Sequence, residues 1–109
     1  YQIPTGISGF HFEWGFHGRP RSSFGIELHF EKGNKEYNKK VINSLEAFKA
    51  EIEKRTGEKV IFQKEWGQTW ARLYIEKDEG NMTEELKKWA VEKMEILYKI
   101  LQPELNRLK

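Results

Sequence analysis

The first third of the chain contains two stretches in which hydrophobic and polar residues alternate. In the first, the even positions from 10 to 16 carry large hydrophobic residues and the odd positions carry mostly polar ones. After a turn-rich segment at 17–23, the second stretch repeats the pattern, with hydrophobic residues at Phe24, Ile26, Leu28 and Phe30. A period of two is typical of a strand with one buried face, so the sequence predicts a β-hairpin over 10–30.

A helical period follows the hairpin, after Gly33 and Asn34 interrupt the alternation. Hydrophobic residues then recur at spacings of four, three and four, at Val41, Leu45, Phe48 and Ile52. This spacing places them on one stripe of an amphipathic helix. Gly57 is expected to end that helix, because glycine readily adopts the left-handed conformation of a C-cap.

The next stretches predict a second hairpin and a second helix. We expect strands at 59–66 and 70–77 around the turn 67–69, with Ala71, Leu73 and Ile75 facing the core. Asn81 and Glu84 have the spacing of a capping box at a helix start. The stripe of that helix comprises Leu86, Ala90, Met94, Leu97 and Leu101. Pro103 is expected to bend or end its last turns.

These elements predict an α+β fold in the order ββαββα. The sheet is expected to have four antiparallel strands made of two hairpins, with both helices packed on one face. The sheet residues expected to meet the helices are Phe10, Phe12, Trp14, Ile26, Leu28 and Phe30. Residues 1–8 are interpreted as a linker or extended segment and 9–109 as a single domain. Because the chain starts with Tyr1, we expect it to be part of a longer protein.

Composition excludes several classes of site. The chain has no cysteine, which excludes disulfides, thiolate zinc sites and a cysteine nucleophile. The 19 basic and 17 acidic residues nearly balance, which argues against a polyanion-coating tail. Serine-hydrolase, phosphate-loop and dinucleotide-binding motifs are absent. Without a signal peptide or a sufficiently long apolar run, a cytoplasmic location is expected. Abundant Lys and Glu without Cys is compatible with a thermophilic source.

The first hairpin suggests a metal site on its polar face. If Phe16 pairs with Phe24, Glu13 lies opposite Glu27 and His11 opposite His29. Imidazoles with carboxylates suit zinc, iron or manganese. The alternative is an ordinary solvated sheet face, for which no cofactor is needed. The residues of this candidate metal site are His11, Glu13, Glu27 and His29, with Glu31 as an alternative to His29.

A magnesium-dependent nuclease site is a further alternative, because such sites place carboxylates and a lysine on neighbouring strands. Acidic and basic residues that fit this description are Glu27, Glu31, Lys32, Lys64, Glu65, Glu76 and Lys77. Charged residues are so common in this chain that such clusters arise by chance, and the first hairpin lacks an anchoring Asp.

The second hairpin suggests a binding surface. Trp70, Arg72 and Tyr74 share the face opposite the expected core, and aromatic and guanidinium groups on an open sheet can stack bases or hold a peptide or small ligand. Arg19 and Arg21 in the first turn would add positive charge. The alternatives are that these aromatic residues are core and that the arginines serve only solubility.

The last helix carries further large hydrophobic residues beside its main stripe, including Trp89, Ile96 and Ile100. They predict either deeper embedding in the domain's own core or an interface, with a second copy of the chain or with an upstream domain.

Several short motifs along the chain together resemble the prokaryotic domain-of-unknown-function family 4268. They are Phe12-Glu13-Trp14, the segment Gly25 to Phe30, Lys64-Glu65-Trp66-Gly67 with Trp70-Ala71-Arg72, and the segment Trp89 to Met94. The resemblance covers about residues 9–108. It implies a C-terminal module attached to larger, often nuclease-like and defence-associated, proteins. It implies no catalytic residue.

The sequence therefore favours a non-catalytic recognition or accessory domain of a nucleic-acid-processing protein, with Trp70, Arg72 and Tyr74 as its contact surface. The alternatives are a metal-dependent nuclease or hydrolase and a structural dimerisation module. Expected partners are nucleic acid, an upstream nuclease-like domain or a second copy of the chain, and no membrane.

Overall fold

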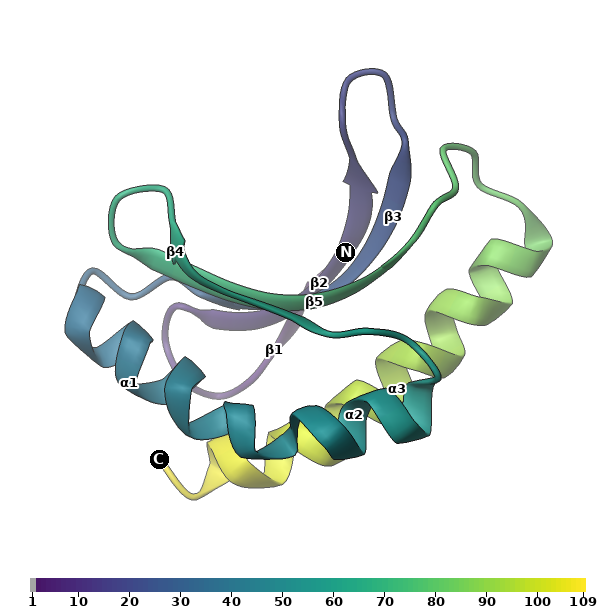
Figure 1. The fold of residues 1–109 in the computed structure, drawn as a ribbon. Helices are drawn as coiled ribbons and strands as arrows, with labels where there is room; N and C mark the ends of the chain where they lie inside the picture. The colour runs from purple at the N-terminus through teal and green to yellow at the C-terminus, as the bar shows by residue number, and fades with distance from the viewer. Residues whose placement is uncertain (1) are drawn as a thin grey trace.

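A computed structural model of the chain describes residues 2–109 and shows one antiparallel sheet with helices on one side (Figure 1). The strands follow the order β1-β2-β3-β5-β4 across the sheet. The elements in chain order are β1 (Gln2–Pro4), β2 (Phe10–His17), β3 (Ser23–Phe30), α1 (Lys35–Leu45), the 3-10 turn η1 (Glu46–Phe48), α2 (Lys49–Thr56), β4 (Ile61–Trp66), β5 (Trp70–Lys77) and α3 (Glu84–Asn106). The predicted α+β class is confirmed.

The sheet is curved, and its convex face packs on the helices while its concave face points away from them (Figure 1). The predicted core residues of both hairpins face the helices. Phe10, Phe12, Ile26, Leu28 and Phe30 are buried, and Trp14 is partly buried against them. The helical stripes also contribute to the core, at Val41, Leu45, Ile52, Leu86, Ala90, Met94, Leu97 and Leu101, whereas Phe48 of the first stripe is only partly buried.

The prediction of four strands is wrong, because residues 2–4 add a fifth strand at the sheet edge. β1 pairs antiparallel with β2, with Ile3 opposite Phe12. The segment behind it is also anchored: the Thr5 hydroxyl donates to the carbonyl of Phe10 over 2.8 Å, and the Gln102 side chain donates to the carbonyl of Thr5 over 2.7 Å. A three-residue edge strand is held by backbone hydrogen bonds and is too short for alternation to reveal it, so the sequence predicted only a linker or extended segment over 1–8.

The first predicted helix is divided into α1, η1 and α2. A short 3-10 turn keeps the chain helical, so the spacing of hydrophobic residues does not reveal it. The predicted stop at Gly57 is confirmed: its φ is 73° and its N–H donates to the carbonyl of Glu53. At the N-terminus of α1, the Asn34 side chain accepts from the N–H of Tyr37 over 3.0 Å.

The start of α3 differs from the predicted capping box. Thr83, not Asn81, is the N-cap, and its hydroxyl accepts from the N–H of Leu86 over 3.0 Å. Both residue types cap helices well, so the sequence alone did not decide between them. The helix continues through Pro103 to Asn106 rather than ending there. No helix within residues 2–109 is long and apolar enough to cross a bilayer.

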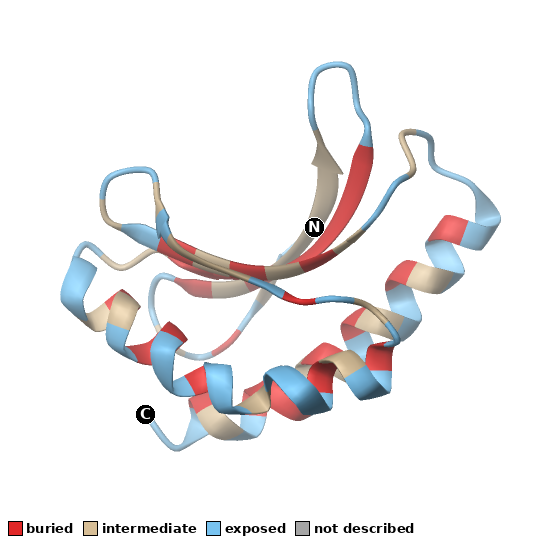
Figure 2. Cartoon of the chain, viewed as in Figure 1, coloured by how far each residue is buried: buried red, intermediate tan, exposed pale blue. Residues whose placement is uncertain are grey.

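Strand β3 lies at the centre of the sheet and is buried along its whole length (Figure 2). Its partner β5 pairs antiparallel with it and places Arg72 opposite His29 and Tyr74 opposite Glu27. The pairing with β5 brings the second hairpin beside the first, although the sequence gives no direct signal of this long-range contact. It is the step that assembles the polar face described below.

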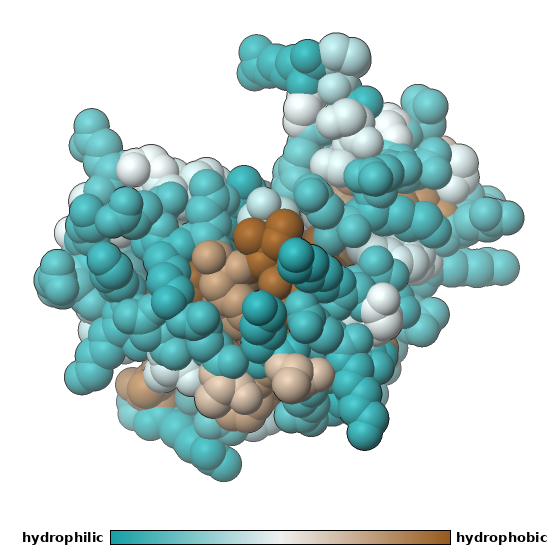
Figure 3. Space-filling model, in the orientation of Figure 1, coloured by the Kyte–Doolittle hydropathy of each residue, from teal (hydrophilic) through white to brown (hydrophobic). Residues whose placement is uncertain are grey.

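The face of the molecule seen in Figure 3 is mostly hydrophilic, with hydrophobic residues gathered in a patch near the centre of the view. Within residues 2–109, the large hydrophobic side chains that remain exposed are Ile61, Trp70, Met82, Val91 and Leu108.

Candidate metal site on the concave sheet face

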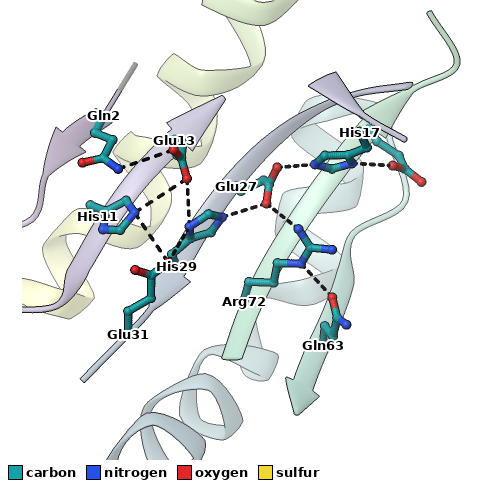
Figure 4. A network of polar contacts seen from close by, with 10 residues as sticks. Gln2, His11, Glu13, His17, Glu27, His29, Glu31, Gln63 and Arg72 are labelled. Atoms are coloured by element: carbon teal, nitrogen blue, oxygen red, sulfur yellow. Dashed lines mark hydrogen bonds and ion pairs between the residues drawn. The ribbon is translucent and has the colours of Figure 1, made fainter. Parts of the chain in front are cut away.

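The concave face of the sheet carries a network of histidine and glutamate side chains from β2 and β3 (Figure 4). The predicted register is confirmed: His11 lies opposite His29, and Glu13 lies opposite Glu27. Odd-numbered residues of both strands therefore point to this face, because side chains alternate along a strand. Glu31 directly follows β3 and extends the same row.

His29 is the centre of the network and is only 5% exposed. Its Nε2 lies 2.8 Å from Oε1 of Glu27. Its Nδ1 lies 2.9 Å from Oε2 of Glu13 and 3.0 Å from Oε2 of Glu31. The imidazole is thus held among three carboxylates, with both ring nitrogens facing oxygen atoms.

His11 completes the cluster from the neighbouring strand. Its Nε2 is buried and has no hydrogen-bond partner among the described residues. The nearest carboxylate oxygens are Oε2 of Glu13 at 3.7 Å and Oε2 of Glu31 at 3.9 Å. One ligand atom from each of His11, His29 and Glu31 lies within 4.8 Å of the others.

These separations suit a single bound cation. Bonds of about 2.0–2.1 Å to a tetrahedral zinc ion place its ligand atoms about 3.3 Å apart. The four distances from the two histidine nitrogens to Glu13 and Glu31 range from 2.9 to 3.9 Å, around that value. Imidazole and carboxylate are the donor types that zinc, iron and manganese accept.

Glu27 lies beside this cluster and is 4% exposed. Its Oε1 accepts hydrogen bonds from His29 and from Nη1 of Arg72, the latter over 3.0 Å, and its Oε2 contacts Nε2 of His17. Burial by itself raises the pKa of Glu27, but the hydrogen bonds from His17 and His29 outweigh that effect and lower the pKa to about 2. The hydrogen bond to Glu27 in turn raises the pKa of His17.

The structure divides the predicted metal residues into two groups. His11, Glu13 and His29 converge as expected, but Glu27 contacts the opposite edge of the His29 ring, away from His11. Glu31, which the sequence interpretation named only as an alternative, lies beside Nδ1 of His29. Cross-strand register places Glu13 opposite Glu27, yet the rotation of the His29 ring decides which carboxylate meets which nitrogen.

His17 belongs to the network, although sequence reasoning did not select it. Its Nδ1 lies 3.2 Å from Oε2 of Glu76, which also accepts from the Ser23 hydroxyl over 3.1 Å. A glycine within the strand pattern at position 25 was a signal, because such a glycine often marks the close approach of another group. In the structure, a side chain at Gly25 would meet His17 and Glu27.

The predicted surface of Trp70, Arg72 and Tyr74 also includes Trp66, which the sequence interpretation did not select and which contacts Arg72 and Trp70. The Arg72 guanidinium lies 4.6 Å from the ring centre of Trp66 and 4.7 Å from that of Tyr74. It also donates to Gln63 over 2.7 Å and to Glu27. Arg72 is therefore engaged inside the face, while Trp70 is 43% exposed.

Arg19 and Arg21 are exposed in the β2–β3 turn, where the Arg21 guanidinium lies 4.7 Å from the ring centre of Phe16. Two charged residues of the alternative nuclease cluster are directed elsewhere: Lys64 pairs with Glu46, and Glu65 pairs with Lys39 over 3.8 Å.

The candidate interface on α3 lies largely against the domain itself. Ile100 is 6% exposed in the core, and Trp89 and Ile96 are partly buried against it. An open apolar groove beside α3 is lined by other residues, namely Ile3, Trp14, Val91, Met94, Glu95, Tyr98 and Lys99. Association through Trp89 and Ile96 stays a prediction.

Comparison with known proteins identifies the family of the chain. No curated protein and no solved structure matches it. The family described as Domain of unknown function (DUF4268) matches residues 1–105. The chain, with its curved sheet and its histidine and glutamate network, belongs to the DUF4268 family.

Proposed function

We propose that this domain binds one divalent first-row transition-metal ion, such as Zn²⁺, on its concave sheet face. His11, His29 and Glu31 are the protein ligands, with Glu13 next to the same two nitrogens. The observation that carries the proposal is the convergence of a buried, unpartnered Nε2 of His11 with Nδ1 of His29 at the same carboxylate.

The protonation requirements of His29 support a cation at this place. Carboxylates only accept hydrogen bonds, so a neutral His29 that donates from Nε2 to Glu27 directs the lone pair of Nδ1 towards the oxygens of Glu13 and Glu31. That arrangement needs a positive group between the nitrogen and the oxygens. A proton on Nδ1 is one such group. A metal ion is another, and it also provides a partner for Nε2 of His11.

A bound ion would give the concave face a means of recognising an anion. The network contains Glu13, Glu27, Glu31 and Glu76, whereas Arg72 is already engaged by Glu27 and Gln63. Such a face repels phosphate, and a bound divalent cation reverses the local charge. We therefore propose a metal-dependent recognition or accessory domain that contacts an anionic partner such as nucleic acid. The nuclease-associated setting of the family resemblance is consistent with this role.

Titration of the metal-free protein with Zn²⁺ in a calorimeter tests metal binding. One ion per chain is expected, and His11→Ala or His29→Ala should abolish tight binding. His17→Gln is the matched control, because it removes the remaining histidine of the chain but no ligand. The ring centres of Trp66 and His29 lie 4.6 Å apart, so Co²⁺ or Ni²⁺ bound to His29 should quench tryptophan fluorescence. Equal binding by wild type and His29→Ala would refute the proposal.

Titration with fluorescent DNA and RNA, with Zn²⁺ or with EDTA, tests recognition separately. Salt-sensitive binding that requires the metal would support it. Metal binding without any nucleic-acid binding would leave the metal site intact as a finding and direct attention to protein partners.

A metal-dependent nuclease or hydrolase is the second candidate. The observation that favours it is the number of protein ligands, since a site with three ligands leaves a coordination position for water. The test is cleavage of DNA, RNA or a small phosphodiester by the Zn²⁺- or Mn²⁺-loaded protein. Cleavage that is lost in His29→Ala would favour this candidate over recognition alone.

A further inference from the structure

We infer that Glu27 is a positioning residue for the metal site: it holds His29 so that Nε2 carries the proton and Nδ1 points at the ion. This inference rests on the proposed function and assigns the residue that sets the geometry of one ligand. Glu27 itself is not a ligand, because it contacts Nε2 of His29, whereas Glu31 contacts Nδ1 on the other side of the ring.

The contacts of Glu27 fix its direction. Its Oε1 lies 3.0 Å from Nη1 of Arg72 and 2.8 Å from Nε2 of His29, and its Oε2 contacts Nε2 of His17. An arginine can only donate, so Oε1 acts as an acceptor. Nε2 of His29 must then carry a hydrogen to lie at hydrogen-bond distance from the same oxygen.

A proton on Nε2 leaves the lone pair of Nδ1 for a metal ion. Metal-bound histidines commonly donate their other ring N–H to a carboxylate, which orients the ring and raises the basicity of the ligand nitrogen. His29 reproduces this arrangement, with Glu27 on one side and the cluster of His11 and Glu31 on the other (Figure 4).

The surroundings hold Glu27 still. The side chain is 5% exposed and lies on the central strand β3, between His17 from β2 and Arg72 from β5. Arg72 is itself held by Gln63 and by the rings of Trp66 and Tyr74. The orientation of His29 therefore depends on side chains from four strands.

The test compares Zn²⁺ affinity in Glu27→Gln with that of wild type and of Glu76→Gln. The control removes the other carboxylate partner of His17 without touching His29. Loss of a carboxylate behind a metal-bound histidine typically weakens metal binding about 10- to 100-fold. Glu27→Gln should show this loss at unchanged stoichiometry, whereas Glu76→Gln should stay close to wild type and His29→Ala should lose the site.

Each outcome separates the inference from the proposed function. If wild type binds Zn²⁺ and Glu27→Gln binds equally well, the positioning role is overturned and the metal site stands. If wild type binds no metal, both are overturned. Nitrogen-15 NMR of Zn²⁺-loaded wild type provides a readout that needs no variant: Nε2–H on His29 supports the inference, and a proton on Nδ1 overturns it.

Discussion

The imidazole of His17 lies directly over Gly25 of the neighbouring strand. A Cβ at Gly25 would come within 2.5 Å of Cε1 of His17 and 2.9 Å of Oε2 of Glu27. The glycine thus leaves the space through which His17 reaches Glu27. Its cross-strand partner Gly15 has no such neighbour, because nothing lies within 4 Å of a Cβ built there.

Gly25→Ala is therefore expected to displace the His17 ring and break its contact with Glu27. A lost hydrogen bond to a charged group costs about 1.5–3 kcal/mol, partly offset by the preference of a strand for alanine over glycine. The free energy of unfolding should fall, and the raised pKa of His17 should return towards its ordinary value of 6.5 in an NMR titration. Gly15→Ala is the control: it should leave the His17 pKa unchanged and raise the free energy of unfolding slightly, by about 0.5–1 kcal/mol. An unchanged His17 pKa in Gly25→Ala would contradict the interpretation.

The stability of the metal-free protein should depend on pH through Glu27 and His17. The folded pKa of Glu27 is about 2 against an ordinary 4.5, so its contribution is present above pH 4.5 and is lost as the pH falls towards 2. This difference corresponds to at most about 3 kcal/mol. The pKa of His17 is raised above 6.5, so its contribution is complete below pH 6.5 and is lost as the pH rises through the folded pKa.

Urea unfolding in the presence of EDTA, at pH values from about 2 to above 6.5, measures how Glu27 and His17 change the free energy of unfolding. The stabilisation from the His17–Glu27 contact should be greatest between pH 4.5 and 6.5. Glu27→Gln should flatten the acid side of the profile, and retention of the wild-type profile in that variant would assign the dependence to other groups.

Arg72→Met should destabilise the fold because it leaves Glu27 with one fewer donor in a buried position. A hydrogen bond to a charged group contributes about 1.5–3 kcal/mol, and His17 and His29 remain as partners of Glu27. Glu27→Gln in the same background should recover part of the loss, so a double-mutant cycle measures the coupling between the two side chains. Additive effects of the two substitutions would show that the 3.0 Å contact contributes little.

Thr83→Ala should lower the free energy of unfolding by about 0.5–2 kcal/mol, because it removes the hydroxyl that caps α3. Asn81→Ala, two residues earlier, is the control and should have a smaller effect because Asn81 lies outside the helix. Thermal or urea unfolding measures the loss of stability in each variant. A larger loss in Asn81→Ala than in Thr83→Ala would indicate that Asn81 is the cap.

Local patterns of hydrophobic and polar residues were sufficient to predict the two hairpins, the helical segments and the buried faces of the strands. The alternation in 10–16 and 24–30 predicted both strands of the first hairpin and their buried sides. The pairing of His11 with His29 followed only on the assumption that Phe16 pairs with Phe24, which the structure confirms. The same reasoning identified Ala71, Leu73 and Ile75 as core. All four predicted metal residues therefore lie at the expected register positions, and three of them, His11, Glu13 and His29, converge.

Which side chains contact one another on the concave face depends on strands that are distant in the sequence. The pairing of β3 with β5 places Arg72 beside Glu27, a contact between residues 45 positions apart that no local pattern encodes. The rotation of the His29 ring places Glu31, and not Glu27, on the side of the ring that faces His11. The edge strand β1 depends on backbone hydrogen bonds to β2. Periodicity reports which face of the sheet a side chain occupies, whereas packing between distant strands sets the rotamers that make a site.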